Sequence, residues 1–79
     1  MEIKILGPGC YKCHDLDKRV REVVKELGID AQIEYVQDIK KIMEYPVLTT
    51  PGLVVDGKVV CSGKVPSKSE IAELVTNAR

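Results

Sequence analysis

The chain has 79 residues, with 12 basic and 12 acidic side chains and a formal net charge of zero. This length predicts one domain, residues 1–79, with one modest hydrophobic core. The balanced charge offers no basic surface for nucleic acid or an anionic membrane, and no apolar run is long enough to span a bilayer. Residues 1–4 lack a signal-peptide pattern, so we expect a cytoplasmic protein that binds neither nucleic acid nor membrane.

The first half of the chain predicts two strands joined by a long helix. Residues 2–6 predict the first strand. Residues 10–27 predict the helix, because apolar side chains recur there at helical spacing, at Leu16, Val20, Val23, Val24 and Leu27. Gly28 is a natural helix stop, and residues 31–36 then predict a strand parallel to the first.

The middle of the chain predicts a short helix followed by a hairpin. Asp38 caps this helix, Pro46 ends it, and its apolar face consists of Ile39, Ile42 and Met43. Asp56-Gly57 separates two short apolar runs, residues 53–55 and 58–61. Both positions of such a turn need a positive φ, which this dipeptide adopts readily.

The last segment predicts a third helix. Ser67 and Glu70 are spaced as a capping box, and an apolar stripe follows at Ile71, Leu74, Val75 and Ala78. The element order is therefore β-α-β-α-β-β-α. It predicts an α/β fold in which one four-stranded mixed sheet is flanked by three helices.

The most informative motif is Cys10-Tyr11-Lys12-Cys13, which follows a Gly7-Pro8-Gly9 turn at the start of the first helix. Two thiols at this spacing can close a small disulfide ring. A helix N-terminus has partial positive charge and unused N–H donors, which favour a thiolate. Cys10 is therefore a candidate nucleophile and Cys13 its resolving partner. Three cysteines are too few for a disulfide scaffold, so a redox or metal-binding role is favoured.

Three segments in this order carry a family resemblance: Gly9 to Cys13 after the first strand, Thr50-Pro51 before the hairpin, and Ser62-Gly63-Lys64-Val65 before the last helix. On these residues the chain resembles the thioredoxin/glutaredoxin superfamily, in particular its small archaeal- and bacterial-type redox-active disulfide proteins. The resemblance implies a thioredoxin-like fold and thiol–disulfide oxidoreductase activity without a cofactor or metal.

The resemblance also implies roles for single residues. Cys10 matches the attacking cysteine, Cys13 the buried resolving cysteine, and Pro51 the cis-proline. Substrate contacts are expected at Tyr11, Lys12, Thr50 and Pro51. The expected partners are a disulfide-containing protein substrate and an upstream reductase or dithiol donor, and we expect a monomer.

Several features depart from the better-known members of the superfamily. The dipeptide between the cysteines is Tyr-Lys, whereas thioredoxins have Gly-Pro and many glutaredoxins Pro-Tyr, and no tryptophan precedes the motif. The paired glycines and Asp that help glutaredoxins hold glutathione are absent after Cys61. The electron donor therefore stays open, and a glutathione-coupled, glutaredoxin-like protein is one alternative.

A thiolate site for copper or zinc on the same two cysteines is the alternative from another class. Copper carriers of similar length follow their first helix with a hairpin, whereas residues 38–44 here predict a helix. A zinc set of Cys10, Cys13, His14 and Cys61 has suitable ligand types, and Cys10 to His14 also matches the C-x-x-C-H haem-attachment pattern.

Cys61 is expected to be a small buried apolar residue, with an auxiliary redox site as the alternative.

Overall fold

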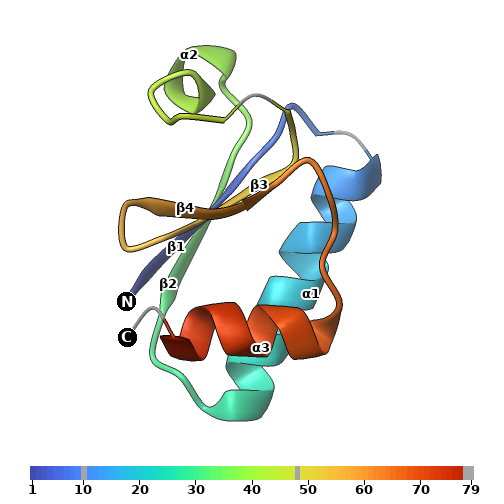
Figure 1. The fold of residues 1–79 in the computed structure, drawn as a ribbon, viewed down its shortest axis with the longest axis vertical. Helices are drawn as coiled ribbons and strands as arrows, with labels where there is room; N and C mark the ends of the chain where they lie inside the picture. The colour runs from blue at the N-terminus through green and yellow to red at the C-terminus, as the bar shows by residue number, and fades with distance from the viewer. Residues whose placement is uncertain (10, 48, 78–79) are drawn as a thin grey trace.

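The computed structural model describes residues 1–9, 11–47 and 49–77, and its centre is a four-stranded mixed sheet (Figure 1). The described strands are β1 (Glu2–Leu6), β2 (Gln32–Val36), β3 (Gly52–Val55) and β4 (Lys58–Ser62). The described helices are α1 (Tyr11–Leu27), α2 (Ile39–Ile42) and α3 (Lys68–Asn77). The strand order is β2-β1-β3-β4, in which β1 and β2 are parallel and the other two pairs are antiparallel. This arrangement confirms the predicted fold class.

The main hydrophobic core lies between the sheet and two helices. Alternate strand residues, such as Ile3 and Ile5 on β1 and Leu53 on β3, pack against buried side chains of α1 and α3. A smaller cluster lies on the opposite face, where Leu6 and Val54 meet Ile42 of α2. In Figure 1, α2 and the start of α1 lie at the same end of the sheet. No helix of the described residues is both long and apolar enough to cross a lipid bilayer.

The apolar stripe of α1 is confirmed except at its last member. Leu16, Val20, Val23 and Val24 are buried, whereas Leu27 is 49% exposed. Gly28 ends the helix with φ at 66°, and the N–H of Ile29 then donates to the carbonyl of Val24 over 3.1 Å. The turned-back Ile29 packs against the core, so Leu27 is left facing solvent.

The apolar face predicted for the short helix is wrong in part. Asp38 caps α2 as expected, because its side chain accepts a hydrogen bond from the Lys40 N–H over 2.9 Å. However, α2 ends at Ile42 rather than at Pro46, and Ile39 and Met43 are 53% and 75% exposed. A single helical turn presents only Ile42 to the sheet.

The hairpin and the capping box form as predicted. Asp56 and Gly57 both have positive φ, at 50° and 82°. At the start of α3, the Glu70 N–H donates to Ser67 Oγ over 3.2 Å, and the Ser67 N–H donates to Glu70 Oε1 over 3.4 Å. The stripe of α3 is buried at Ile71 and Val75 and partly buried at Leu74, while Ala78 lies outside the described residues.

Candidate functional site

The predicted site begins where β1 leads into α1. The chain turns through Gly7, Pro8 and Gly9, and Gly9 has a φ of 99°, a backbone conformation that glycine adopts without strain. The described part of α1 then starts at Tyr11. Cys10, the predicted nucleophile, lies outside the described residues.

The described residues of the motif differ in their exposure to solvent in the first turn of α1. Tyr11 is 81% exposed and Lys12 is exposed, whereas Cys13 is fully buried. No acidic side chain lies in this turn of α1, all of whose residues are described, so no carboxylate there opposes a thiolate at the helix start. The expected burial of Cys13 is confirmed. The expected substrate contacts of Tyr11 and Lys12 stay predictions.

Gly7 lies directly against the Cys13 side chain. A Cβ built on Gly7 would overlap Cys13 Sγ and would stand 2.9 Å from Cys13 Cβ. The Gly7 N–H donates to the Val36 carbonyl over 2.9 Å, which continues the pairing of β1 with β2. The sequence analysis treated Gly7 only as part of a turn. The signal that could have singled it out is its position between a buried strand and the buried cysteine.

The Thr50–Pro51 peptide bond is cis, which confirms the prediction made for Pro51. Pro51 is buried and Thr50 is partly exposed. In the antiparallel pairing of β1 with β3, Leu6 lies opposite Gly52. Gly7, which follows Leu6, and Pro51, which precedes Gly52, therefore lie at the same end of the sheet, where Gly7 also contacts Cys13.

The third segment of the resemblance lies against the second. Gly63, which follows β4, donates its N–H to the Pro51 carbonyl over 2.8 Å. Its φ is 77°, and a Cβ placed on it would overlap Thr49 Oγ1. Glycine at this position therefore allows the chain after β4 to pack closely against the segment that contains the cis bond.

His14 is exposed and packs against Tyr35 of β2. The ring centroids are 5.4 Å apart and the ring planes meet at 75°, an edge-to-face arrangement. Within residues 1–9, 11–47 and 49–77, no three side chains of His, Cys, Asp or Glu are grouped as a metal site.

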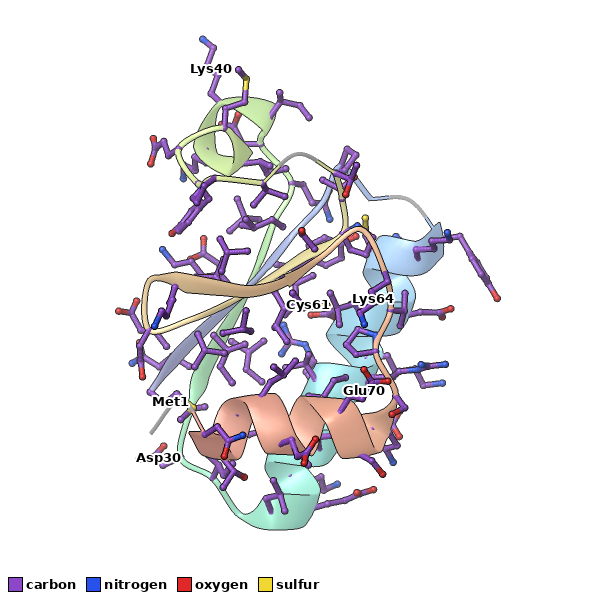
Figure 2. The ribbon with its side chains drawn as sticks, viewed as in Figure 1. Met1, Asp30, Lys40, Cys61, Lys64 and Glu70 are labelled. Atoms are coloured by element: carbon purple, nitrogen blue, oxygen red, sulfur yellow. The ribbon has the colours of Figure 1, made fainter. Side chains whose placement is uncertain are left out.

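Cys61 is only partly buried, so the expectation of a buried apolar residue is wrong in degree. Its pocket, of about 190 Å³, is lined by β4 and α3 and includes Lys64, Glu70 and Leu74 (Figure 2). Burial is the main cause that raises the pKa of the Cys61 thiol; the Lys64 ammonium lowers this pKa and the Glu70 carboxylate raises it. The thiol form is therefore favoured at neutral pH.

Comparison with known proteins agrees with this arrangement. The family model described as the thioredoxin domain matches residues 1–76. A thioredoxin of Methanothermobacter thermautotrophicus is 45% identical over 76 residues, which cover 96% of this chain and 99% of the relative. A thioredoxin of Methanocaldococcus jannaschii is 46% identical over 71 residues, which cover 90% of this chain and 81% of the relative.

A second thioredoxin of Methanocaldococcus jannaschii is 30% identical over 72 residues, covering 87% of this chain and 84% of the relative. These matches lend no support to the glutathione-coupled or metal-binding alternatives. The chain belongs to the thioredoxin domain family and is a thiol–disulfide oxidoreductase.

Proposed function

We propose that this oxidoreductase reduces disulfides of protein substrates with a dithiol formed by Cys10 and Cys13. The observation that carries the proposal is the burial of Cys13 in the first turn of α1, against Gly7 and at the end of the sheet that holds the cis Thr50–Pro51 bond. Cys13 is fully buried and so cannot meet a folded partner first. The attacking role therefore goes to Cys10, which directly precedes α1.

The reaction has two exchange steps. The Cys10 thiolate attacks one sulfur of the substrate disulfide, a mixed disulfide forms, and the first substrate thiolate leaves. The Cys13 thiolate then attacks Cys10 Sγ, the Cys10–substrate bond breaks, and the second substrate thiolate leaves. The substrate gains two electrons and the protein is left with a Cys10–Cys13 disulfide, which an upstream reductase or dithiol donor reduces.

The start of α1 supports a thiolate on Cys10. A cysteine in a C-x-x-C motif at a helix start can have a pKa near 7, compared with about 8.5 for an ordinary thiol. The unused N–H groups and the dipole of α1 supply this effect, and the exposed Lys12 adds a positive charge in the same turn. We propose Tyr11, Lys12, Thr50 and Pro51 as the substrate contacts. A cytoplasmic location and a monomeric state remain predictions of the sequence.

The test compares three single substitutions in an insulin-reduction assay with a chemical dithiol as donor. Cys10→Ser is expected to abolish reduction, because the attacking sulfur is lost. Cys13→Ser, reduced, freed of the donor and mixed with insulin, is expected to accumulate a mixed disulfide that mass spectrometry detects on Cys10. The control, Cys61→Ser, is expected to keep the activity. Full activity in Cys10→Ser would overturn the proposal.

Two further measurements separate the alternatives. A reduction potential near −270 mV would place the dithiol with thioredoxins, whereas one near −200 mV would favour glutathione coupling. Metal analysis of protein purified under reducing conditions addresses the other alternative. One tightly held copper or zinc ion per chain would favour the metal-binding site over the redox dithiol.

A further inference from the structure

Gly7, which directly follows β1, lies closely against Cys13 in the first turn of α1. Gly7 is buried, and its φ lies outside the left-handed region, so its backbone conformation is one that other residues can adopt. The need for glycine is therefore steric. The atoms that an added Cβ would meet are Sγ and Cβ of Cys13.

Rotation of the thiol would not remove this overlap. The position of Cys13 Cβ does not depend on the side-chain rotamer, and it would stand only 2.9 Å from a Cβ on Gly7. Nor is the end of β1 easily displaced, because the Gly7 N–H is bonded to the Val36 carbonyl and Leu6 is paired on both sides, with Val36 and with Gly52. A larger residue at position 7 would therefore push the first turn of α1, and Cys13 with it, away from the sheet.

We propose that Gly7 is a positioning residue for the resolving thiol: its missing side chain lets the end of β1 hold Cys13 Sγ where it can attack the mixed disulfide. This inference rests on the proposed function. The first exchange step uses the Cys10 sulfur and does not need Cys13. The second step forms the Cys10–Cys13 bond and breaks the Cys10–substrate bond, so only this step depends on where Cys13 Sγ stands.

The proposal predicts that Gly7→Ala separates the two steps. A misplacement of about 1 Å can slow a reaction step by about 100-fold, so we expect resolution to be slower by about tenfold or more while attack is little changed. The matched control is Gly52→Ala. Gly52 is also buried and outside the left-handed region, but the atoms nearest to a Cβ there are Val47 methyl carbons, at an ordinary 3.4 and 3.5 Å, and Leu6 Cβ at 3.6 Å.

The experiment uses the full chain with Cys61→Ser, reduced and mixed with one equivalent of 5,5′-dithiobis(2-nitrobenzoate). The first nitrothiobenzoate anion released reports attack, and the second reports resolution. Stopped-flow absorbance is expected to show a delayed second release in Gly7→Ala but not in Gly52→Ala. Mass spectrometry is expected to detect a persistent adduct on Cys10 in the Gly7→Ala chain. A second release in Gly7→Ala at the rate of the unsubstituted chain would overturn the proposal.

Folding is tested in parallel by urea unfolding of Gly7→Ala, Cys13→Gly and the double variant. Cys13→Gly removes both atoms that the new Cβ would overlap. The loss of stability caused by Gly7→Ala should therefore be smaller in a chain that carries Cys13→Gly than in a chain that keeps Cys13. A Gly7→Ala chain that stays unfolded even with Cys13→Gly would overturn the proposal, since Gly7 would then be required by the fold alone. If the chain with Gly7 and Cys61→Ser releases only one nitrothiobenzoate anion, that result contradicts the proposed dithiol function and not the role of Gly7.

Discussion

At the scale of single residues, the two cysteines in the described part of the chain lie in different surroundings. Cys13 is fully buried against Gly7, at the end of the sheet where the cis bond lies. Cys61 lies on β4, an edge strand of the sheet, in a pocket lined in part by charged side chains. This difference supports the proposal that the redox chemistry belongs to the first helix, and the raised pKa of Cys61 makes it a slowly reacting thiol.

Cys61 should therefore titrate above the usual range of a thiol. In a chain with Cys10→Ser and Cys13→Ser, the pH profile of iodoacetamide alkylation is expected to have a raised midpoint, because burial raises the pKa of Cys61. Lys64→Met should raise this pKa further and slow alkylation at neutral pH, since the Lys64 ammonium lowers it. Glu70→Gln should lower the pKa and speed the reaction. Equal profiles for the three chains would contradict this assignment.

The same shift has a defined sign in the stability of the protein. The folded chain keeps the Cys61 proton to a higher pH than the unfolded chain does. The contribution of Cys61 to the free energy of unfolding is therefore complete below the ordinary thiol pKa. It is lost as the pH rises through the raised one.

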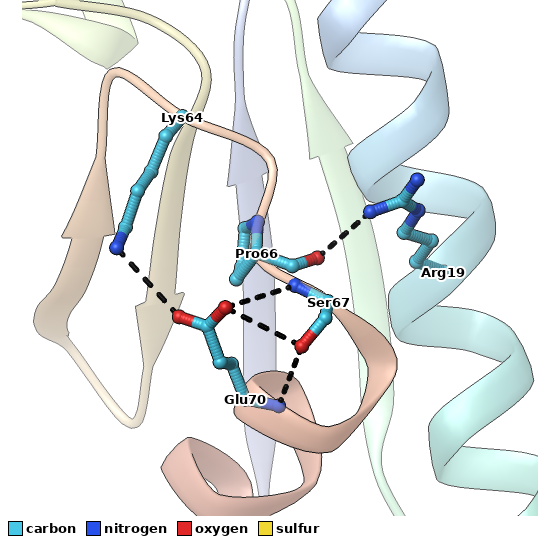
Figure 3. A network of polar contacts seen from close by, with 5 residues as sticks. All are labelled: Arg19, Lys64, Pro66, Ser67 and Glu70. Carbon is cyan, nitrogen blue, oxygen red and sulfur yellow. Dashed lines mark hydrogen bonds and ion pairs between the residues drawn. The ribbon is translucent and has the colours of Figure 1, made fainter.

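At the scale of elements, the connection between β4 and α3 links the cis-proline segment to the helical layer. At one end of this connection, Gly63 donates to the Pro51 carbonyl. At the other end, Arg19 of α1 donates to the Pro66 carbonyl over 3.1 Å, and Ser67 caps α3 (Figure 3). Further along, Lys68 pairs with Glu22 and Glu26 of α1. The two ends of this connection are thus bonded to different parts of the fold, the cis-proline segment at one end and the helical layer at the other.

Ser67→Ala tests this cap. Losing the Ser67 Oγ acceptor leaves the Glu70 N–H without its capping bond, and we expect a loss of about 1 kcal/mol in the free energy of unfolding. Urea unfolding followed by far-ultraviolet circular dichroism measures the change. The matched control is Ser69→Ala, an exposed serine in the same helical turn, which should alter stability by less than about 0.5 kcal/mol. Equal losses in the two variants would show that the cap is not the cause.

At the scale of the whole molecule, stability depends mainly on the larger of the two hydrophobic clusters, which lies between the sheet and the helices α1 and α3. The chain has no Phe or Trp, so Ile, Leu and Val side chains supply this core. A small domain is stable by only about 5–15 kcal/mol, so one large cavity removes a considerable part of the total. The core also supports the site, because Leu16 lies one turn after Cys13 on the buried face of α1.

Leu16→Ala and Leu27→Ala compare the same substitution at two positions of α1. Leu16 is fully buried, and we expect its loss to lower the free energy of unfolding by about 2–5 kcal/mol. Leu27 is 49% exposed, and its loss should change that free energy by less than about 1 kcal/mol. Urea midpoints give both values. Similar losses would mean that Leu27 is buried in solution as the periodicity of the sequence predicted.

Local patterns in the sequence were enough to predict the elements, because each depends on neighbours within a turn or a strand. The β1 bounds, the Asp56-Gly57 turn and the Ser67–Glu70 capping box all follow from such patterns. Leu27, Ile39 and Met43 were predicted wrongly because helical periodicity says which face a side chain lies on. It does not say how far the neighbouring layer extends.

The sequence by itself determined the order of strands and helices, the spacing of the Cys10-Tyr11-Lys12-Cys13 motif and the family, since these depend on residues near one another in the chain. Only the tertiary structure decided that Gly7 touches Cys13, that Leu6 lies opposite Gly52, next to the cis bond, and that Gly63 bonds to Pro51. These contacts join segments that are distant in the chain. They are set by the register of β1 with β3 and by the packing of α1 on the sheet, which no local pattern encodes.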